Sequence, residues 1–340
     1  MAGCWRALLL MAVLVGSYPA GAAERVEVPL RQTVLSNGNI RYSVDVSIAG
    51  SRPLAAMVDT GSVGLRILAR AVADTDFTSI SDQRSVYGYG SGVRLNGLVA
   101  TLRAGLGRLS DPAPIPVQLV RVVDCFPKRP HCPASRVSQA DYRIGGDGLP
   151  KEGFDAILGI AMGTGPVDNP LRRLGAETWI VILPRPSEDR PGTLILNPHA
   201  GELAGYTLFP TEHRLKDLPG GAEFHDGIPG CLMIKRSGKK ICGPTLLDTG
   251  APGISINSSD PADRNGWSKG DRFAIIFRSR QGGEIQAGFE AGAGAASRFS
   301  TSAPQDGSWR EAHISAGTLL YFLFSVFYDD KRQLIGLKPR

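Results

Sequence analysis

One short motif occurs twice in the 340-residue chain, and it constrains the fold more than any other feature. Val58 precedes the segment Asp59–Gly61, and Leu247 precedes the segment Asp248–Gly250, 189 positions later. Each copy of Asp-Thr-Gly follows an apolar stretch that has the length and composition of a buried strand. A single copy would be read as a strand-ending turn whose Asp accepts backbone hydrogen bonds. Two copies in this setting predict two β-rich halves, each delivering one Asp to a common site.

Paired carboxyl groups are suited to general acid–base chemistry. Two carboxylates about 3 Å apart cannot both be ionised, so Asp59 and Asp248 would share one proton. One of them would act as general base on a water molecule while the other donates a proton to a substrate carbonyl, without a covalent intermediate. Glycine lets each loop approach the other closely, and we expect Thr60 and Thr249 to hydrogen-bond across to the opposite loop. The motif therefore predicts Asp59 and Asp248 as catalytic residues.

Alternation of apolar and polar residues dominates the rest of the chain and predicts an all-β fold. Gly (42 residues) and Pro (24 residues) are abundant, which favours strands joined by tight turns over long helices. Strands are expected at residues 42–48, 54–58, 94–106, 194–196, 232–234, 245–247 and 273–277. A hairpin turn at Asn96-Gly97 is expected to split the third of these. Short helices are expected at residues 170–175 and 318–322.

The length of the chain indicates two folded units, each able to bury its own core. A polar segment flanked by proline at residues 185–191 precedes the expected boundary. We therefore predict a first half over residues 24–200, with the first Asp-Thr-Gly copy, and a second half over residues 201–340, with the second copy.

The first 23 residues are typical of a secretory signal peptide. Arg6 supplies the positive start, residues 7–15 are apolar, and the segment Ala20–Ala22 fits a small-residue cleavage site. This apolar run and the one at residues 319–327 are too short to span a membrane. We expect a secreted or periplasmic protein without a stable membrane span. About 15 residues would separate the cleavage site from the first clear strand, which leaves no room for a propeptide.

Four cysteines follow the signal peptide, and an even number in an exported chain suggests disulfides. Of the three possible pairings, we expect the local one, Cys125 with Cys132 and Cys231 with Cys242, because these pairs close short loops. Free buried thiols are the alternative. The five histidines are scattered without the spacing of metal ligands, so no metal or other cofactor is predicted.

Charge and motif content narrow the range of partners. The formal net charge of +6 is mild for this length, and no run of Lys and Arg is interleaved with aromatic residues, which argues against nucleic-acid binding. The basic residues from Lys235 to Lys240 surround Gly238 and predict a solvated hairpin tip. We find no Gly-x-Ser-x-Gly elbow, no cysteine with a catalytic context and no phosphate-binding loop. The expected partner is a peptide or protein substrate, and the protein is expected to be a monomer.

From about Asn39 to its end, the order of these blocks resembles that of the pepsin-like aspartic proteases. Besides the two Asp-Thr-Gly copies, residues 86–92 resemble the family's flap, and residues 154–160 resemble the segment that supports the first catalytic loop. The resemblance implies a bilobal fold with few short helices and an extended peptide bound between the lobes. It implies substrate contacts at Gly61, Tyr87, Gly88 and Gly250, and support of the catalytic pair by Thr60, Ser62 and Thr249.

Three positions depart from the family's pattern. Ala251 stands where Ser or Thr is usual and cannot offer Asp248 a hydroxyl, so we expect an active window in mildly acidic pH, with its acid limb raised. Arg66 stands where Trp is usual, and it would either stack on Tyr87 or act through its charge on the ionised pair. The supporting segment of the second half aligns as Ile314–Ala316, where two apolar residues and Gly are usual.

The resemblance predicts an aspartic-type endopeptidase. The alternative is a non-catalytic protein of the pepsin fold that binds peptides or proteins, a possibility that Arg66 and the segment Ile314–Ala316 keep open. A third hypothesis is an unrelated exported all-β domain with chance motifs. Digestion of an unfolded protein, with and without a statine-type inhibitor, separates the first two hypotheses.

Overall fold

The computed structural model describes residues 23–49, 52–110, 114–163, 167–186, 188–211, 227–265, 267–279, 283–303 and 312–340. All but the last residue of the predicted signal peptide therefore lies outside the described residues. Within these ranges the chain is mostly β, as the sequence predicted, with three α-helices of four or five residues. No helix in the described ranges is long and apolar enough to cross a membrane.

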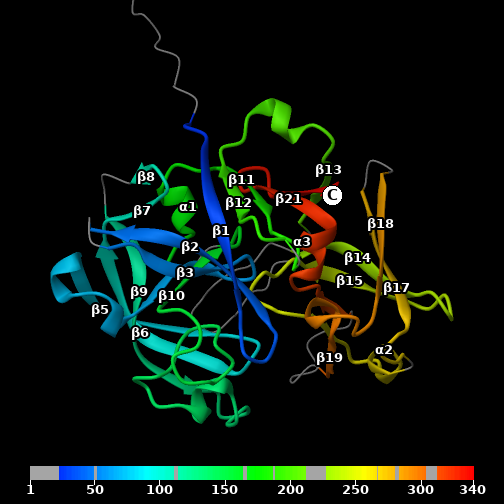
Figure 1. Ribbon diagram of the computed structural model, residues 1–340, viewed down its shortest axis with the longest axis horizontal. Helices are drawn as coiled ribbons and strands as arrows, with labels where there is room; N and C mark the ends of the chain where they lie inside the picture. Colours follow the sequence, from blue (N-terminus) through cyan, green and yellow to red (C-terminus); the bar gives the residue numbers. More distant parts are fainter. Residues whose placement is uncertain are drawn as a thin grey trace, which may run out of the picture.

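The first half of the chain contributes twelve strands and one helix to the described structure (Figure 1). The strands are β1 (Val26–Val34), β2 (Ile40–Ile48), β3 (Leu54–Asp59), β4 (Val63–Leu68), β5 (Phe77–Gly88), β6 (Val93–Leu102), β7 (Ala104–Leu106), β8 (Leu109–Ser110), β9 (Ile115–Cys125), β10 (Ala156–Ile160), β11 (Thr178–Ile182) and β12 (Gly192–Leu196). The helix is α1 (Pro170–Arg173), capped by the side chain of Asn169.

The second half contributes ten strands and two helices to the described structure. The strands are β13 (Thr207–Pro210), β14 (Gly227–Ile234), β15 (Lys240–Leu246), β16 (Ile254–Asn257), β17 (Arg272–Arg278), β18 (Glu284–Glu290), β19 (Phe299–Ser302), β20 (His313–Ser315), β21 (Phe324–Asp329) and β22 (Leu334–Pro339). The helices are α2 (Pro261–Arg264) and α3 (Leu319–Leu323).

The largest sheet joins the two halves through its long first strand. The beginning of β1 pairs with β12, from Val26 opposite Leu196, and its end pairs with β2, as far as Val34 opposite Ile40. Beyond β12 the order is β11, β21, β22 and β13, so the last strands of the chain extend the sheet begun by the first half. Beyond β2 the order is β3, β10, β4, β9, β6 and β5.

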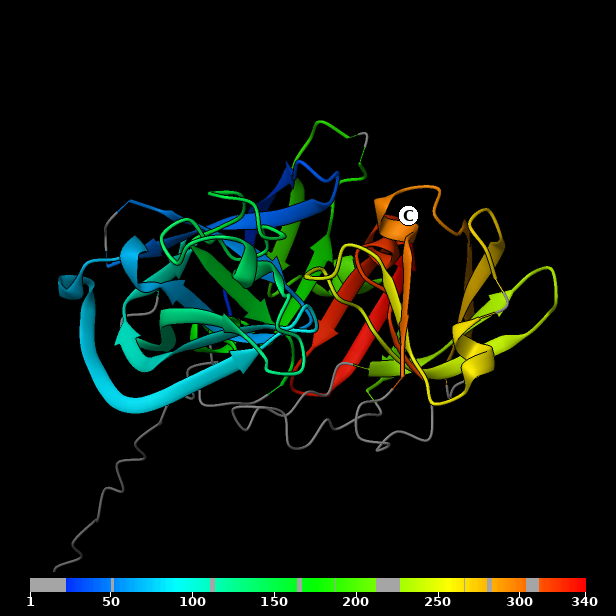
Figure 2. The same cartoon turned by 90° about the horizontal axis from the view of Figure 1, so that it is seen from below.

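A second sheet of seven strands belongs to the second half alone, in the order β18-β17-β14-β15-β20-β16-β19. Figure 2 shows the first half on one side and this sheet on the other, with the red strands β21 and β22 between them. One apolar core includes buried residues of both halves. The rings of Phe209 on β13, in the large sheet, and Phe277 on β17, in the seven-stranded sheet, lie 5.9 Å apart and connect the two sheets.

The two strands that lead to the Asp-Thr-Gly copies occupy interior positions in their sheets. β3 lies between β2 and β10, with Val58 opposite Leu158 on the parallel β10. β15 lies between β14 and β20, with Thr245 opposite Ile314 on the parallel β20. Strands covered on both faces are apolar along their whole length rather than alternating, which accounts for the fully buried Val58.

The predicted strands at residues 42–48, 54–58, 194–196, 232–234, 245–247 and 273–277 correspond to β2, β3, β12, β14, β15 and β17, and both predicted helices are present. The predicted turn at Asn96-Gly97 is wrong, because β6 continues through it. Gly97 lies at a bulge opposite β9, where a Cβ atom would come within 1.9 Å of the Leu119 carbonyl oxygen. Glycine is required here by a close approach of strands, and the hairpin turn lies earlier, between β5 and β6.

Candidate active site

Asp59 and Asp248 face each other across the two Asp-Thr-Gly loops. A Cβ atom on Gly61 would lie 2.6 Å from Oδ1 of Asp248, and one on Gly250 would lie 2.6 Å from Oδ1 of Asp59. Each carboxyl group is therefore packed against the glycine of the opposite loop, where only glycine fits. The two carboxyl groups lie close enough to share a hydrogen bond when one of them is protonated.

The two threonines of the motif lock the loops together by reciprocal hydrogen bonds. The backbone N–H of Thr60 donates to Oγ1 of Thr249 over 3.1 Å, and the backbone N–H of Thr249 donates to Oγ1 of Thr60 over 2.9 Å. Each hydroxyl also donates to a carbonyl of the opposite strand, Thr60 to Leu247 (2.7 Å) and Thr249 to Val58 (2.8 Å). Because both threonines are fully buried, these bonds fix the separation of the strand ends in a dry environment.

A buried tyrosine that sequence reasoning missed lies beneath this pair. The hydroxyl of Tyr321, on α3, donates to Oγ1 of Thr60 over 2.7 Å and lies 2.5 Å from the hydroxyl of Tyr328 on β21. Tyr328 stacks on Trp179 of β11, with ring centroids 5.6 Å apart. The only sequence signal was a pair of tyrosines within an apolar run, a pattern that a core segment shows equally well.

Backbone amides solvate the inner oxygen of each carboxyl group. Gly61 N–H donates to Oδ1 of Asp59 over 2.8 Å, and Gly250 N–H donates to Oδ1 of Asp248 over the same distance. Ala251 N–H donates to the same oxygen of Asp248 over 3.2 Å. Ala251 therefore stabilises the Asp248 carboxylate through its backbone N–H, although its side chain has no hydroxyl.

The outer oxygens of the pair differ in their surroundings. Ser315, on β20, has its hydroxyl 3.5 Å from Oδ2 of Asp248. The hydroxyl of Ser62, expected to support Asp59, is buried and has no hydrogen-bond partner among the described residues. Ser62 instead packs closely on β10, where a Cβ atom on Gly159 would lie 2.7 Å from its hydroxyl oxygen.

The supporting segment of the second half is shifted by one residue from the alignment expected from the sequence. Ser315 pairs with Leu246, two residues before Asp248, as Ile157 pairs with Met57 in the first half. The counterpart of Gly159 is therefore Gly317 rather than Ala316. Gly317 has a φ of +54°, and a Cβ atom there would lie 2.3 Å from the carbonyl oxygen of Gly253.

The environment of Asp248 favours its protonated form. Asp248 is half-buried at the end of its loop and borders a cavity between the two halves of the chain. Desolvation by burial raises the pKa of Asp248 well above its usual value, and the negative charge of Asp59 raises it further. The amides of Gly250 and Ala251 oppose the rise but do not cancel it. The pair is thus arranged to hold one proton between its two carboxyl groups.

A cavity of about 870 Å³ opens over the two carboxyl groups, and we call it the cleft. The first half lines it with residues 87–91 of the β5–β6 hairpin, and the second half lines it with residues 250–255. Asp59, Gly61, Asp248 and Gly250 all border it. The structure therefore brings the expected catalytic and substrate-contacting residues to one cavity between the two halves of the chain.

Tyr87 is held at the cleft by an arginine. The guanidinium carbon of Arg66 lies 3.5 Å from the centre of the Tyr87 ring, and both side chains are buried. Of the two expectations for Arg66, the stacking on Tyr87 is confirmed. Arg66 also donates to the carbonyl of Gly64 over 3.2 Å, and the backbone N–H of Val63 bonds the Tyr87 hydroxyl. Burial raises the pKa of Tyr87, so its hydroxyl stays protonated.

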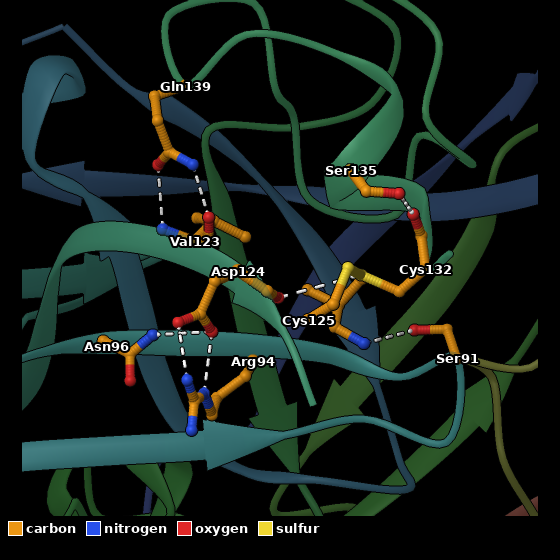
Figure 3. The surroundings of a disulfide bond; sticks show 10 residues. Ser91, Arg94, Asn96, Val123, Asp124, Cys125, Cys132, Ser135 and Gln139 are labelled. Atoms are coloured by element: carbon orange, nitrogen blue, oxygen red, sulfur yellow. Dashed lines mark hydrogen bonds and ion pairs between the residues drawn. A yellow bond between two sulfur atoms is a disulfide. The ribbon is translucent and has the colours of Figure 1, made fainter. Parts of the chain in front are cut away.

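The turn between β5 and β6 is braced by the loop at residues 126–131. The backbone N–H of Phe126 donates to the carbonyl of Gly92 over 2.9 Å, and Arg129 donates to the carbonyl of Gly90. The Cys125–Cys132 disulfide closes this loop, and Figure 3 shows it among the residues around it, Ser91 of the turn included. The second disulfide joins Cys231 to Cys242 across β14 and β15. Both links follow the local pairing expected from the sequence.

The described residues offer no group of three or more His, Cys, Asp or Glu side chains that could hold a metal ion. Comparison with known proteins gave no assignment, because no family model and no curated protein matches the chain. The functional interpretation therefore depends on the chemistry of the site itself.

Proposed function

We propose that this protein is an aspartic-type endopeptidase with the bilobal pepsin-like fold, and that Asp59 and Asp248 are its catalytic pair. One observation carries the proposal: two carboxyl groups on equivalent loops lie within hydrogen-bonding reach of each other at a cleft between the halves of the chain. Shared-proton carboxyl pairs of this kind perform acid–base hydrolysis. The lobes would be residues 24–200 and 201–340, each supplying one Asp-Thr-Gly loop.

The proposed reaction begins with Asp248 holding the shared proton, in accord with its raised pKa. Asp59 removes a proton from a water molecule whose oxygen attacks the carbonyl carbon of the substrate, while Asp248 donates its proton to the carbonyl oxygen. The resulting gem-diol collapses as the C–N bond breaks. The leaving amine takes the proton from Asp59, and a hydroxyl of the gem-diol returns one to Asp248. No covalent enzyme intermediate forms.

The substrate of this reaction would be an extended peptide in the cleft. The β5–β6 hairpin would act as the flap, with Gly88 and Gly90 offering backbone groups to the peptide main chain. Tyr87 would border the scissile bond with its ring orientation fixed by Arg66. Two disulfides and the predicted signal peptide favour a secreted or periplasmic location.

The test is hydrolysis of a reduced, alkylated protein and of a fluorogenic peptide library across pH 3–8. The wild-type protein should release peptides, a statine-type inhibitor should block the release, and Asp59→Asn or Asp248→Asn should abolish it. Asp82→Asn, on the exposed part of β5, is the matched control and should retain activity. Full activity in either dyad variant, with contamination excluded, would show the mechanism to be wrong.

The second candidate is a protein of the same fold that binds peptides without cleaving them. The specific observation in its favour is the Ser62 hydroxyl, which lacks a bond to Asp59. Peptide binding by the folded wild-type protein, with no turnover at any pH, would favour this candidate.

A further inference from the structure

We propose that one end of the cleft is a recognition subsite for a carboxylate side chain of the bound peptide, with Arg298 as its specificity-determining residue. The inference rests on the proposed function, because it takes the cleft to hold a peptide. The subsite consists of Arg298 together with Asn39, Arg41 and Asp147, all of which line the cleft.

Arg41 forms the fixed base of the subsite. It is only 4% exposed, and its guanidinium group donates to the carbonyls of Gly145 (3.0 Å) and Gly250 (3.2 Å). It also forms an ion pair with Asp147 at 3.2 Å. Gly250 follows Asp248 by two residues, so the bond to its carbonyl places Arg41 beside the loop that carries Asp248. Because the charge of Arg41 is already paired with Asp147, Arg41 is positioned to organise the subsite rather than to bind an anion.

A chain of hydrogen bonds orients Arg298 from this base. The side-chain amide of Asn39 donates to Oδ2 of Asp147 over 2.7 Å, which directs its carbonyl oxygen the other way. Arg298 donates to that oxygen over 3.0 Å. Asn39 is buried, so the contact is made at a fixed point. The amide of Asn39 therefore couples the exposed Arg298 of one half to the half-buried Arg41–Asp147 ion pair of the other.

In the described part of the chain, Arg298 has no counter-charge, whereas the other two charges of the subsite balance each other. Among the described residues, no Asp or Glu lies within ion-pair distance of Arg298, whereas Arg41 and Asp147 pair with each other. The described residues therefore leave one positive charge uncompensated at this end of the cleft. A guanidinium group has five N–H donors in a planar fork and binds a carboxylate through two of them. The chemical class that satisfies Arg298 is an Asp or Glu side chain of a peptide residue near the scissile bond.

The experiment uses fluorogenic peptides of one neutral parent sequence, with Glu or Gln placed at each position in turn. We expect kcat/KM to favour Glu over Gln by about tenfold at one position, and the preference to weaken as salt is raised. Arg298→Gln should remove the preference, and Arg298→Lys should retain part of it because it keeps the charge but not the fork. Arg278→Gln is the matched control, since Arg278 is exposed, pairs with Glu284 and does not line the cleft.

The outcomes separate this inference from the proposed function. Hydrolysis with equal rates for Glu and Gln at every position, or a preference that survives in Arg298→Gln, would overturn the subsite and leave the peptidase standing. If no peptide is cleaved, the affinities of the same labelled peptides are measured by fluorescence anisotropy, and they test the subsite without catalysis. A Glu preference in binding that Arg298→Gln abolishes supports the subsite without catalysis, and equal or absent binding of the two peptides overturns it.

Discussion

The hydroxyl of Ser315 lies 3.5 Å from Oδ2 of Asp248, the carboxyl oxygen that the amides of Gly250 and Ala251 do not reach. A hydrogen bond from this hydroxyl would favour the ionised form of Asp248 and so lower its pKa, against the larger effect of burial. Because Asp248 is the member of the pair with the raised pKa, its ionisation would govern the alkaline limb of the activity profile in the proposed mechanism. The sequence alone, without the position of Ser315, predicts an effect of Ala251 on the acid limb instead.

Replacing Ser315 by alanine should therefore move the alkaline limb of kcat/KM upward. The contact is long, so a shift of about 0.5 pH units is expected. Ala251→Thr adds a donor and should move the same limb downward. The measurement is kcat/KM against pH on one peptide, with Ser255→Ala, a cleft-lining serine on the adjacent strand, as control. A downward shift in Ser315→Ala would contradict the hydrogen-bond argument.

The raised pKa of Asp248 also predicts how stability depends on pH. A carboxyl group with a higher pKa in the folded state than in the unfolded state binds its proton more tightly when folded. Its contribution to the free energy of unfolding is fully present below the ordinary carboxyl pKa of about 4 and is lost as pH rises from there. Wild type should thus lose stability between acidic and neutral pH through this group.

Asp248→Asn should therefore be more stable than wild type at pH 7, by about 1–3 kcal/mol, and the difference should shrink toward pH 4. Urea denaturation at both pH values measures it. A variant that is less stable than wild type at pH 7 would indicate that the native state does not disfavour ionisation of Asp248.

Loss of the buried hydroxyl in Tyr321→Phe should weaken both the fold and catalysis. The change removes the donor to Thr60 and leaves the Tyr328 hydroxyl without that partner, so the free energy of unfolding should fall by about 1–3 kcal/mol. Because Thr60 helps to fix the loop of Asp59, kcat should fall as well. Tyr206→Phe removes a hydroxyl pair with Ser325 away from the cleft, and it should affect stability without lowering kcat. Equal effects of the two variants on kcat would contradict the proposed bracing.

The Cys125–Cys132 disulfide should influence substrate binding. Replacing both cysteines by serine loosens the loop that holds the β5–β6 turn through Phe126 and Arg129, so KM should rise severalfold. The control is the Cys231→Ser, Cys242→Ser double variant, whose disulfide crosslinks β14 and β15 of the seven-stranded sheet. Both double variants should lose about 2–3 kcal/mol of stability. A similar KM for both would show that the loop does not position the turn.

Features that depend on local pattern could be predicted from the sequence. The strand leading to Asp59 was recognisable because burial on both faces produces an unbroken apolar run. The disulfides were predictable because short loops are easily closed. The two Asp-Thr-Gly copies indicated a common site because each places a carboxyl group at the end of an apolar strand. The structure brings both carboxyl groups to one cleft.

Features that depend on long-range register could not be predicted. Asn96-Gly97 has the composition of a turn, but the backbone of Leu119 approaches Gly97 closely, and no local signal reports that neighbour. The pairing of Ser315 with Leu246 determines which side chain of β20 faces Asp248. A register shifted by one residue would bring a different side chain to that carboxyl group. Tyr321 could be read equally well as an ordinary core residue.

The pairing of β11 has a consequence for how the chain is synthesised. β11 lies between β12 and β21, with Thr178 opposite Asp329, so its second neighbour is made about 150 residues later. Until the last strands emerge, β11 presents an unpaired apolar edge. Such an edge can pair with another chain and aggregate unless a chaperone binds it first. We expect a nascent chain truncated after residue 200 to need a holding chaperone, whereas the full-length chain covers this edge by its own final hairpin.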